Sequence, residues 1–157
     1  MKEKMWRLWK TVATVFVLAV AVNYPWELAQ APLYEGMDDF SLSLWHCFVA
    51  SLGDGLLVLL IFGAGWAALR RSDWFVNPGQ RGYLVMLAAG LAIALVVEWA
   101  AVHVAGQWTY APRMPVIPIL NVGLAPITQM LALPPLIFRG VAMSHRGGVR
   151  EGRGGRG

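Results

Sequence analysis

Residues 83–105 read YLVMLAAGLAIALVVEWAAVHVA, an apolar run that contains a single carboxylate, Glu98. A helix of about 20 apolar residues is long enough to cross the hydrocarbon core of a bilayer. Three more stretches of the chain meet this length requirement, at residues 11–31, 42–69 and 116–138. The sequence therefore predicts an all-α fold, a four-helix transmembrane bundle.

The overall composition agrees with a membrane protein. Of the 157 residues, 57% are hydrophobic and only 14% are charged. One soluble core of this size could not bury so much apolar surface. The formal charge of +4 comes from basic residues at segment ends rather than in one patch, so we predict contact with a lipid bilayer and no nucleic-acid partner. A single cysteine, Cys47, excludes an intrachain disulfide.

The basic residues also predict an orientation. Lysine and arginine number four before the first span and none in the first loop, then three in the second loop, one in the third and five after the last span. Positive charge accumulates on the cytoplasmic side of membrane proteins. We therefore predict that the N- and C-termini are cytoplasmic in a multi-pass protein of the plasma membrane, which is the inner membrane of a bacterium. The same scheme places four tryptophans at the cytoplasmic interface: Trp6, Trp9, Trp66 and Trp74.

The N-terminal segment has a second interpretation. A basic start followed by a short apolar run also describes a signal peptide, with Ala19-Val20-Ala21 as its cleavage site. Cleavage would leave three spans in the same orientation. Both interpretations stay open at the level of sequence.

Prolines interrupt the fourth stretch at positions 115, 118, 126, 134 and 135. Proline removes a backbone donor and clashes with the preceding helical turn, so we expect a broken or kinked fourth helix. Residues 1–138 then form a single transmembrane domain. Residues 139–157 are rich in glycine and arginine, and we predict a disordered cytoplasmic tail there.

Polar residues recur inside the spans with helical spacing. Asn23, Glu27, Gln30 and Tyr34 stand at i, i+4, i+7 and i+11, which places them on one stripe of the first helix. An ionisable group at bilayer depth costs about 2.5–3.5 kcal/mol on insertion scales. Such residues therefore require an explanation.

Four of these residues are candidates for acid–base catalysis: Asp54, Glu98, Glu27 and His46. All but Asp54 lie near the non-cytoplasmic ends of the spans, and Asp54 lies about 12 Å deeper than His46 along the same helix. Proton or ion conduction is a second possible use of such a set. The structural alternative is that Glu27 extends to water and His46 makes bonds between helices. We predict no metal and no cofactor, because the paired H-x-x-H or E-x-x-H spacing of metal sites is missing from the sequence.

Residues 108–138 resemble the lycopene cyclase domain, a small membrane domain of carotenoid biosynthesis. The similarity rests on W-T-Y-A-P at 108–112, N-V-G-L-A-P-I-T-Q-M at 121–130 and L-P-P-L-I-F at 133–138. Thr128-Gln129 stands where that family has a pair of acids. The resemblance implies an isoprenoid-binding pocket without implying lycopene cyclisation. The substrate-binding residues proposed on this basis are Trp108, Tyr110, Gln129 and Asn121.

Two functional hypotheses follow. The first is a membrane-embedded enzyme or binder of a hydrophobic, isoprenoid-like lipid, with a polar acid–base site in the outer half of the bilayer. The second is a non-catalytic subunit or assembly factor of a larger membrane complex, in which apolar faces pack against a membrane-protein partner or a second copy of the chain. The sequence leaves open whether the protein is an enzyme.

Overall fold

The computed structural model describes residues 2–37 and 40–154. Its four long helices are α1 (Lys2–Gln30), α2 (Phe40–Leu69), α3 (Gly79–Trp99) and α4 (Leu124–Gly154). Shorter elements join them: η1 (Ala31–Leu33), η2 (Trp74–Val76), the π-helical turn η3 (Ala100–Val104), and the strands β1 (Val116–Ile117) and β2 (Val122–Gly123). Each long helix contributes a segment that is long and apolar enough to span a membrane. The predicted all-α bundle of four membrane-spanning helices is confirmed.

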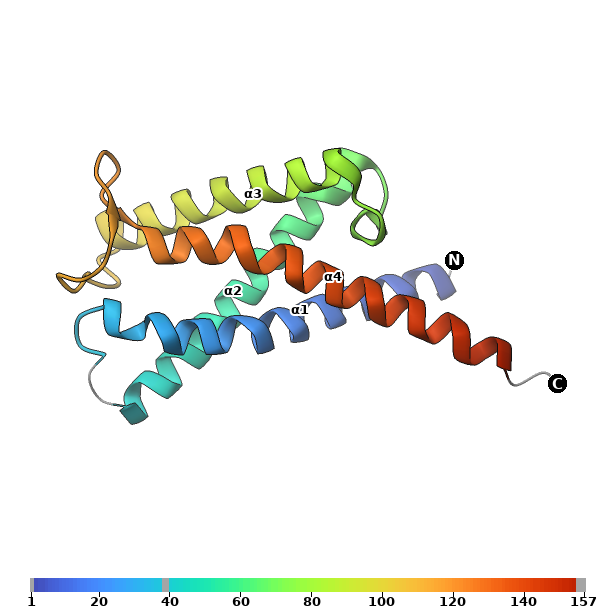
Figure 1. Cartoon of the computed structure of the whole chain (residues 1–157), viewed down its shortest axis with the longest axis horizontal. Helices are drawn as coiled ribbons and strands as arrows, with labels where there is room; N and C mark the ends of the chain where they lie inside the picture. The colour runs from blue at the N-terminus through green and yellow to red at the C-terminus, as the bar shows by residue number, and fades with distance from the viewer. Residues whose placement is uncertain (1, 38–39, 155–157) are drawn as a thin grey trace.

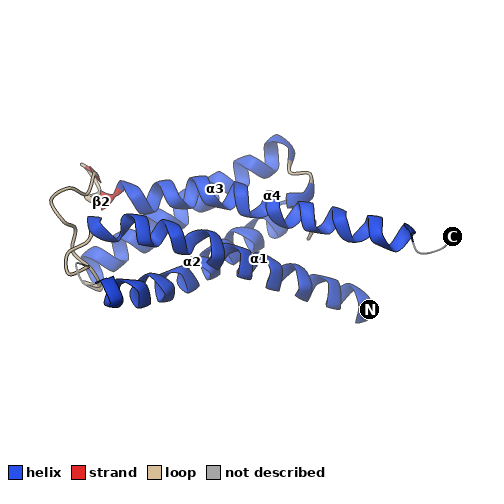
Figure 2. Ribbon diagram, turned by 60° about the horizontal axis from the view of Figure 1, so that its bottom comes forward, coloured by secondary structure: helices blue, strands red, loops and turns tan. Residues whose placement is uncertain are grey.

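The helices form an antiparallel bundle in which α1 packs against α2 and α4, and α3 packs against the same two helices. Figure 1 shows the beginning of α1 and the end of α4 at the same end of the bundle, beside the connection between α2 and α3. The other two connections gather at the opposite end (Figure 2). The assignment of the end with the termini to the cytoplasm stays a prediction.

The fourth span begins later than predicted. Residues 116–123 form a short antiparallel hairpin, in which Val116 pairs with Gly123 and Ile117 with Val122, and α4 starts only at Leu124. The prolines at 115 and 118 explain the difference, because neither can supply the backbone N–H that a continuing helix needs. Pro126 is tolerated in the first turn of α4, where the N–H groups lack helical partners in any case.

The division of the chain at residue 138 stays a prediction, although the helix and its packing continue beyond that residue. Val141 and Ala142 are buried in the main core, and α4 continues to Gly154 into the segment predicted as an irregular tail. The packed part of α4 therefore extends at least one further turn. The kink expected at Pro134 and Pro135, which both lie inside α4, stays a prediction.

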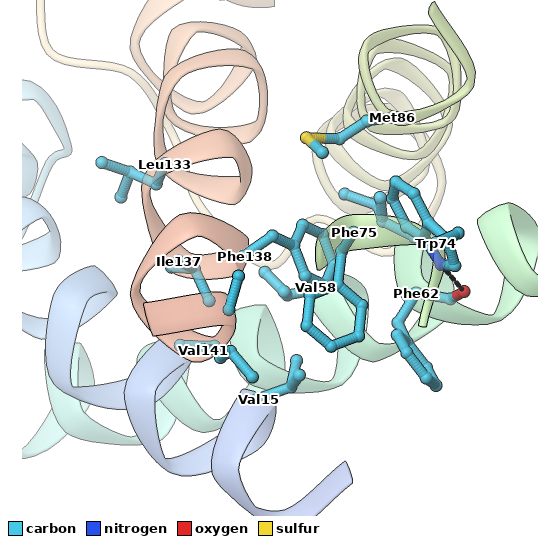
Figure 3. Packing of buried hydrophobic residues seen from close by; sticks show 13 residues of the cluster. Val15, Val58, Phe62, Trp74, Phe75, Met86, Leu133, Ile137, Phe138 and Val141 are labelled. Atoms are coloured by element: carbon cyan, nitrogen blue, oxygen red, sulfur yellow. Dashed lines mark hydrogen bonds between the residues drawn. The ribbon is translucent and has the colours of Figure 1, made fainter. Parts of the chain in front are cut away.

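The main hydrophobic core fills the half of the bundle near the connection between α2 and α3. Figure 3 shows that Trp74 and Phe75, from that connection, point inward among side chains of all four long helices. The Trp74 indole Nε1 donates a hydrogen bond to the Phe62 carbonyl oxygen at 3.1 Å. The prediction that Trp74 marks the membrane interface is therefore wrong, since its side chain is 0% exposed.

Small residues bring the helices close together elsewhere. A Cβ placed on Gly90 would lie 2.5 Å from the Met130 carbonyl oxygen on α4, and one on Gly55 would lie 2.9 Å from the Phe16 ring on α1. The backbone contact leaves no room for a side chain on Gly90, and a side chain on Gly55 would require the Phe16 ring to shift. These glycines hold α3 against α4 and α2 against α1, in the manner of small-residue contacts between membrane helices.

Candidate functional site

A cavity of about 340 Å³ lies in the half of the bundle opposite the main core. All four long helices contribute to its wall, as do Tyr34, Met37 and Trp108 from the two connections at that end. Its volume is within the range of about 300–1,000 Å³ typical of ligand pockets. Apolar side chains form much of the wall, and the polar groups converge from six residues: Glu27, Gln30, His46, Asp54, Glu98 and Gln129.

The Gln129 side chain is the hub of the polar network. Its Nε2 lies 2.8 Å from Asn23 Oδ1, 2.9 Å from Glu27 Oε1 and 2.8 Å from Asp54 Oδ2. Its Oε1 accepts a hydrogen bond from Gln30 Nε2 at 3.1 Å. An amide nitrogen has two hydrogens, so three acceptors must share them. This one side chain therefore ties α4 to both α1 and α2.

The α1 members of the network are held by their own helix. Asn23 Nδ2 donates to the Ala19 carbonyl oxygen at 2.8 Å, which leaves Asn23 Oδ1 facing Gln129. Trp26 Nε1 donates to Gln30 Oε1 at 3.2 Å, and Gln30 Nε2 donates to Glu27 Oε1 at 2.6 Å. These bonds set the direction in which each amide points. Among the described residues, every buried side-chain nitrogen and oxygen has a partner.

Glu27 and Asp54 face the same amide, because Gln129 Nε2 lies 2.9 Å from Glu27 Oε1 and 2.8 Å from Asp54 Oδ2. Their hydrogen bonds are to the neutral amides of Gln30 and Gln129. The ion pair found in the described part of the chain joins Arg71 and Asp73, which are exposed in the connection at the opposite end of the bundle. Glu27 and Asp54 therefore converge on one amide, in a part of the described bundle without an ion pair.

Glu98 occupies a separate part of the cavity wall. The Tyr110 hydroxyl donates to Glu98 Oε1 at 2.6 Å, and Trp108 Nε1 donates to the same oxygen at 3.3 Å. The Tyr110 oxygen in turn accepts the Gly123 backbone N–H at 2.7 Å. Glu98 is only 3% exposed and directly precedes Trp99 and the π-helical turn η3, the kind of irregularity that is frequent at functional sites.

The two connections at this end are joined by backbone hydrogen bonds. Tyr34 and Tyr110 form an isolated antiparallel β-bridge. Beside it, the Glu35 N–H donates to the Thr109 carbonyl oxygen and the Ala111 N–H donates to the Leu33 carbonyl oxygen, both at 2.9 Å. We refer to the joined segments 31–35 and 108–113 as the cap. The cap lies over the end of the cavity where Tyr34 and Trp108 contribute to its wall.

Aromatic side chains fill the inner side of the cap. The Tyr34 ring lies 6.1 Å from the Trp108 ring and 5.9 Å from the Tyr110 ring. Burial, followed by the negative charge of nearby carboxylates, raises the pKa of the Tyr34 phenol far above its ordinary value. Burial and the hydrogen bond to Glu98 raise the pKa of Tyr110. Both phenols are therefore neutral hydrogen-bond donors at physiological pH.

The structure brings together most of the residues singled out from the sequence. Asp54, Glu98, Glu27 and His46 all contribute to the wall of one cavity. The cavity therefore contacts both Asp54 and His46, which are eight residues apart on α2. Their role in acid–base catalysis stays a prediction.

The residues proposed as substrate-binding are more dispersed. Trp108 and Gln129 line the cavity, and Tyr110 reaches it through Glu98. Asn121 instead occupies the exposed turn of the hairpin, with φ at +50°, a left-handed conformation that asparagine adopts more readily than most residues. A pocket contact for Asn121 is not supported by this position.

Two members of the network were not assigned a role from the sequence. Asn23 and Gln30 fall on the predicted polar stripe of the first helix, and that stripe was the signal that identified them. What the stripe could not reveal is the partner on α4. In the described residues, no group of three or more histidine, cysteine, aspartate or glutamate side chains is arranged to hold a metal ion.

No protein-family model, curated protein or solved structure matches the chain. The resemblance of residues 108–138 to the lycopene cyclase domain therefore stays a hypothesis that rests on short motifs. The function has to be argued from the cavity itself.

Proposed function

We propose that this membrane protein binds a hydrophobic, isoprenoid-like lipid in the cavity and exchanges protons with it. The observation that carries the proposal is the convergence of three carboxyl groups, Glu27, Asp54 and Glu98, on one cavity among membrane-spanning helices. Such groups are costly at bilayer depth and usually mark functional sites. The apolar remainder of the wall suits a hydrocarbon ligand.

The arrangement supports acid–base chemistry on a carbon–carbon double bond. In the proposed reaction one carboxyl group of the Glu27–Asp54 pair is protonated and donates its proton to one alkene carbon, whose π electrons form the new C–H bond. The neighbouring carbon becomes a carbocation, which the faces of Tyr34 and Trp108 stabilise. A carboxylate then removes a proton from an adjacent carbon, and that C–H pair becomes the new double bond. One proton enters and one leaves, so the net reaction is an isomerisation or ring closure.

Deuterium incorporation tests this reaction without knowledge of the natural substrate. The protein would be incubated in heavy water in phosphatidylcholine vesicles that contain a linear polyene hydrocarbon such as squalene. The mass of the recovered hydrocarbon would then be measured by mass spectrometry. We expect C–H positions to gain deuterium with the wild type. General acid catalysis contributes typically 10²–10⁴-fold, so Asp54→Asn and Glu98→Gln should each slow incorporation by about 100-fold or more.

A matched control is available in Asp73→Asn, which makes the same change at an exposed position in the distant connection. It should leave the rate unchanged. Incorporation that is absent in the wild type, or that persists at full rate in Asp54→Asn and Glu98→Gln, would refute the proposed chemistry.

A second candidate function is an assembly factor or non-catalytic subunit. The observation in its favour is that the polar network of the described residues is fully hydrogen-bonded, as expected of groups that only join helices. In that case Asp54→Asn should lower the amount of folded protein and the yield of a crosslinked partner protein. The two candidates predict different outcomes for Asp54→Asn. The first predicts a folded variant with slower deuterium incorporation, and the second predicts a smaller amount of folded protein.

A further inference from the structure

The cavity is closed at both ends along the bundle axis. At one end the cap covers it, held by the hydrogen bonds between its two segments and by a bond from Arg113 Nε to the Pro32 carbonyl oxygen at 2.8 Å. Toward the other end the packed core fills the bundle, with Val58 and Ile61 of α2 at 0% exposure. A ligand of any size therefore has to enter through a side wall.

One side wall is open. His46, Ala50 and Gly53 of α2 line the cavity and are exposed at the molecular surface, and Val97 of α3 lines it while 37% exposed. The opposite wall is sealed, since Gln129 of α4 is 1% exposed. Figure 1 shows that α2 and α3 lie near each other at their connection and are far apart at their other ends.

The open wall lies at bilayer depth. Ala50 and Gly53 are seven and ten residues beyond Ser43, where the apolar segment of α2 begins. At a rise of about 1.5 Å per residue this places them about 10–15 Å along the helix from the membrane boundary. Glu27 and Asp54 are half-buried behind this opening, whereas Asn23 and Gln129 of the same network are buried. The opening thus leads from lipid to the carboxyl pair.

We infer that the ligand enters and leaves the cavity sideways from the bilayer, between α2 and α3 and over Ala50 and Gly53. This inference rests on the proposed function, which supplies the ligand. It adds the chemical class of that ligand. The ligand is an uncharged lipid with a slender apolar end, because a charged or strongly polar end would have to cross hydrocarbon to reach the opening. The cap then excludes water from the carboxyl groups while lipid has access to them.

Gly53 provides a way to close the opening without disturbing the fold. Among the described residues, nothing lies within 4 Å of a Cβ placed on Gly53, so a larger side chain meets no neighbour. Replacing a helical glycine also favours the helix by up to about 1 kcal/mol. Gly63, on the same helix, has equally free space but belongs to the other half of the bundle. Gly63→Leu is therefore the matched control for Gly53→Leu.

Cys47 is a reporter inside the cavity. It is the only cysteine in the sequence, it lines the cavity and it is 4% exposed. The labelling rate of its thiol would be measured in phosphatidylcholine vesicles with two maleimides, one with a long alkyl chain that dissolves in the bilayer and one with a sulfonate that stays in water. The same thiol is labelled in each variant, so its intrinsic reactivity cancels from the comparison.

We expect the alkyl maleimide to react with wild-type Cys47 at least tenfold faster than the sulfonated one. Gly53→Leu should slow the alkyl maleimide at least tenfold, and Gly63→Leu should leave its rate unchanged. Ala50→Leu is a second variant of the same wall and should act like Gly53→Leu. Equal rates for the two reagents in the wild type, or unchanged alkyl labelling in both opening variants, would overturn the inference.

The outcome is separable from that of the proposed function, since labelling requires no ligand and no reaction. Slow labelling in the opening variants without any deuterium incorporation in the wild type would support the side opening and refute the chemistry. Unaffected labelling together with deuterium incorporation would support the chemistry and refute this route of entry.

Discussion

Replacing Gln129 with methionine tests whether the polar network holds the helices together. The two side chains have similar length and volume, so the packing changes little, but the amide is lost. Asn23 Oδ1, Glu27 Oε1 and Asp54 Oδ2 then lose their Gln129 donor, and Gln30 Nε2 loses the Gln129 acceptor. Glu27 and Gln30 still bond to each other.

The expected cost is about 2 kcal/mol in the free energy of unfolding. Asn23 is 0% exposed, and a buried acceptor deprived of its donor costs about 1–3 kcal/mol. An independent route gives a similar value, because hydrogen bonds between membrane helices average about 0.6 kcal/mol each and four are removed here. A loss of about 2 kcal/mol reduces the folding equilibrium constant by about 30-fold.

Unfolding in mixed detergent micelles, followed by circular dichroism, measures this loss. Thr128→Val is the matched control, because Thr128 is an exposed neighbour whose hydroxyl donates to the Leu124 carbonyl oxygen of its own helix. It should remain within about 0.5 kcal/mol of the wild type. The variant Asn23→Leu combined with Gln129→Met should cost less than the two single changes together, since the two side chains share a bond. A Gln129→Met protein as stable as the wild type would refute the structural role of the network.

Three further outcomes follow from the packing and from the cap. Gly90→Leu should lower the free energy of unfolding in micelles by about 3 kcal/mol, because its Cβ would lie 2.5 Å from an α4 carbonyl oxygen. The control Gly63→Leu should cost less than about 0.5 kcal/mol. Equal costs for the two variants would contradict the close helix contact. Trp74→Ala should cost about 3–5 kcal/mol through the cavity it leaves and the lost indole hydrogen bond, and full stability of this variant would show that the connection does not support the core. The pKa values of the Tyr34 and Tyr110 phenols are raised, so the folded state keeps protons that the unfolded state releases near pH 10. The free energy of unfolding should therefore be constant below that pH and fall as the pH rises above it. Phenylalanine at both positions should flatten that fall, and an unchanged slope of unfolding free energy against pH would contradict the burial of the two phenols.

Hydrophobicity and spacing were sufficient to predict the helices and the polar stripe. The run at 83–105 has the length and composition of a membrane span, and residues 79–104 are helical in the structure and apolar enough to cross a membrane. Asn23, Glu27 and Gln30 fall on one helix face because 3.6 residues make a turn, whatever the helix packs against. These properties are local, so they can be read from a short stretch of sequence.

Features that depend on contacts between distant segments could not be predicted. The bond from Gln129 to Asn23 joins residues that are 106 positions apart, and no local pattern pairs them. The residues on either side of Trp74 in the sequence are those expected of an interfacial tryptophan. Its inward position depends on the space beside Gly65, where a Cβ would lie 2.2 Å from the indole. The hairpin at 116–123 was predicted as part of a helix because its residues are apolar, although its prolines argue against one.

The division of the bundle into two halves explains how an interior cavity is compatible with stability. Trp74, Phe75 and Phe138 pack with ring separations of 5.2–6.3 Å in one half, and apolar contact there needs no polar partner. In the other half the helices are held by amide hydrogen bonds and by the cap, which leave room between them. A network whose only task was to join helices would need no cavity at its centre and no opening to lipid, and a fully packed apolar interior would serve at least as well. The space beside the Glu27–Asp54 pair is therefore the feature that a purely structural role does not explain, and it is the reason to look for a ligand there.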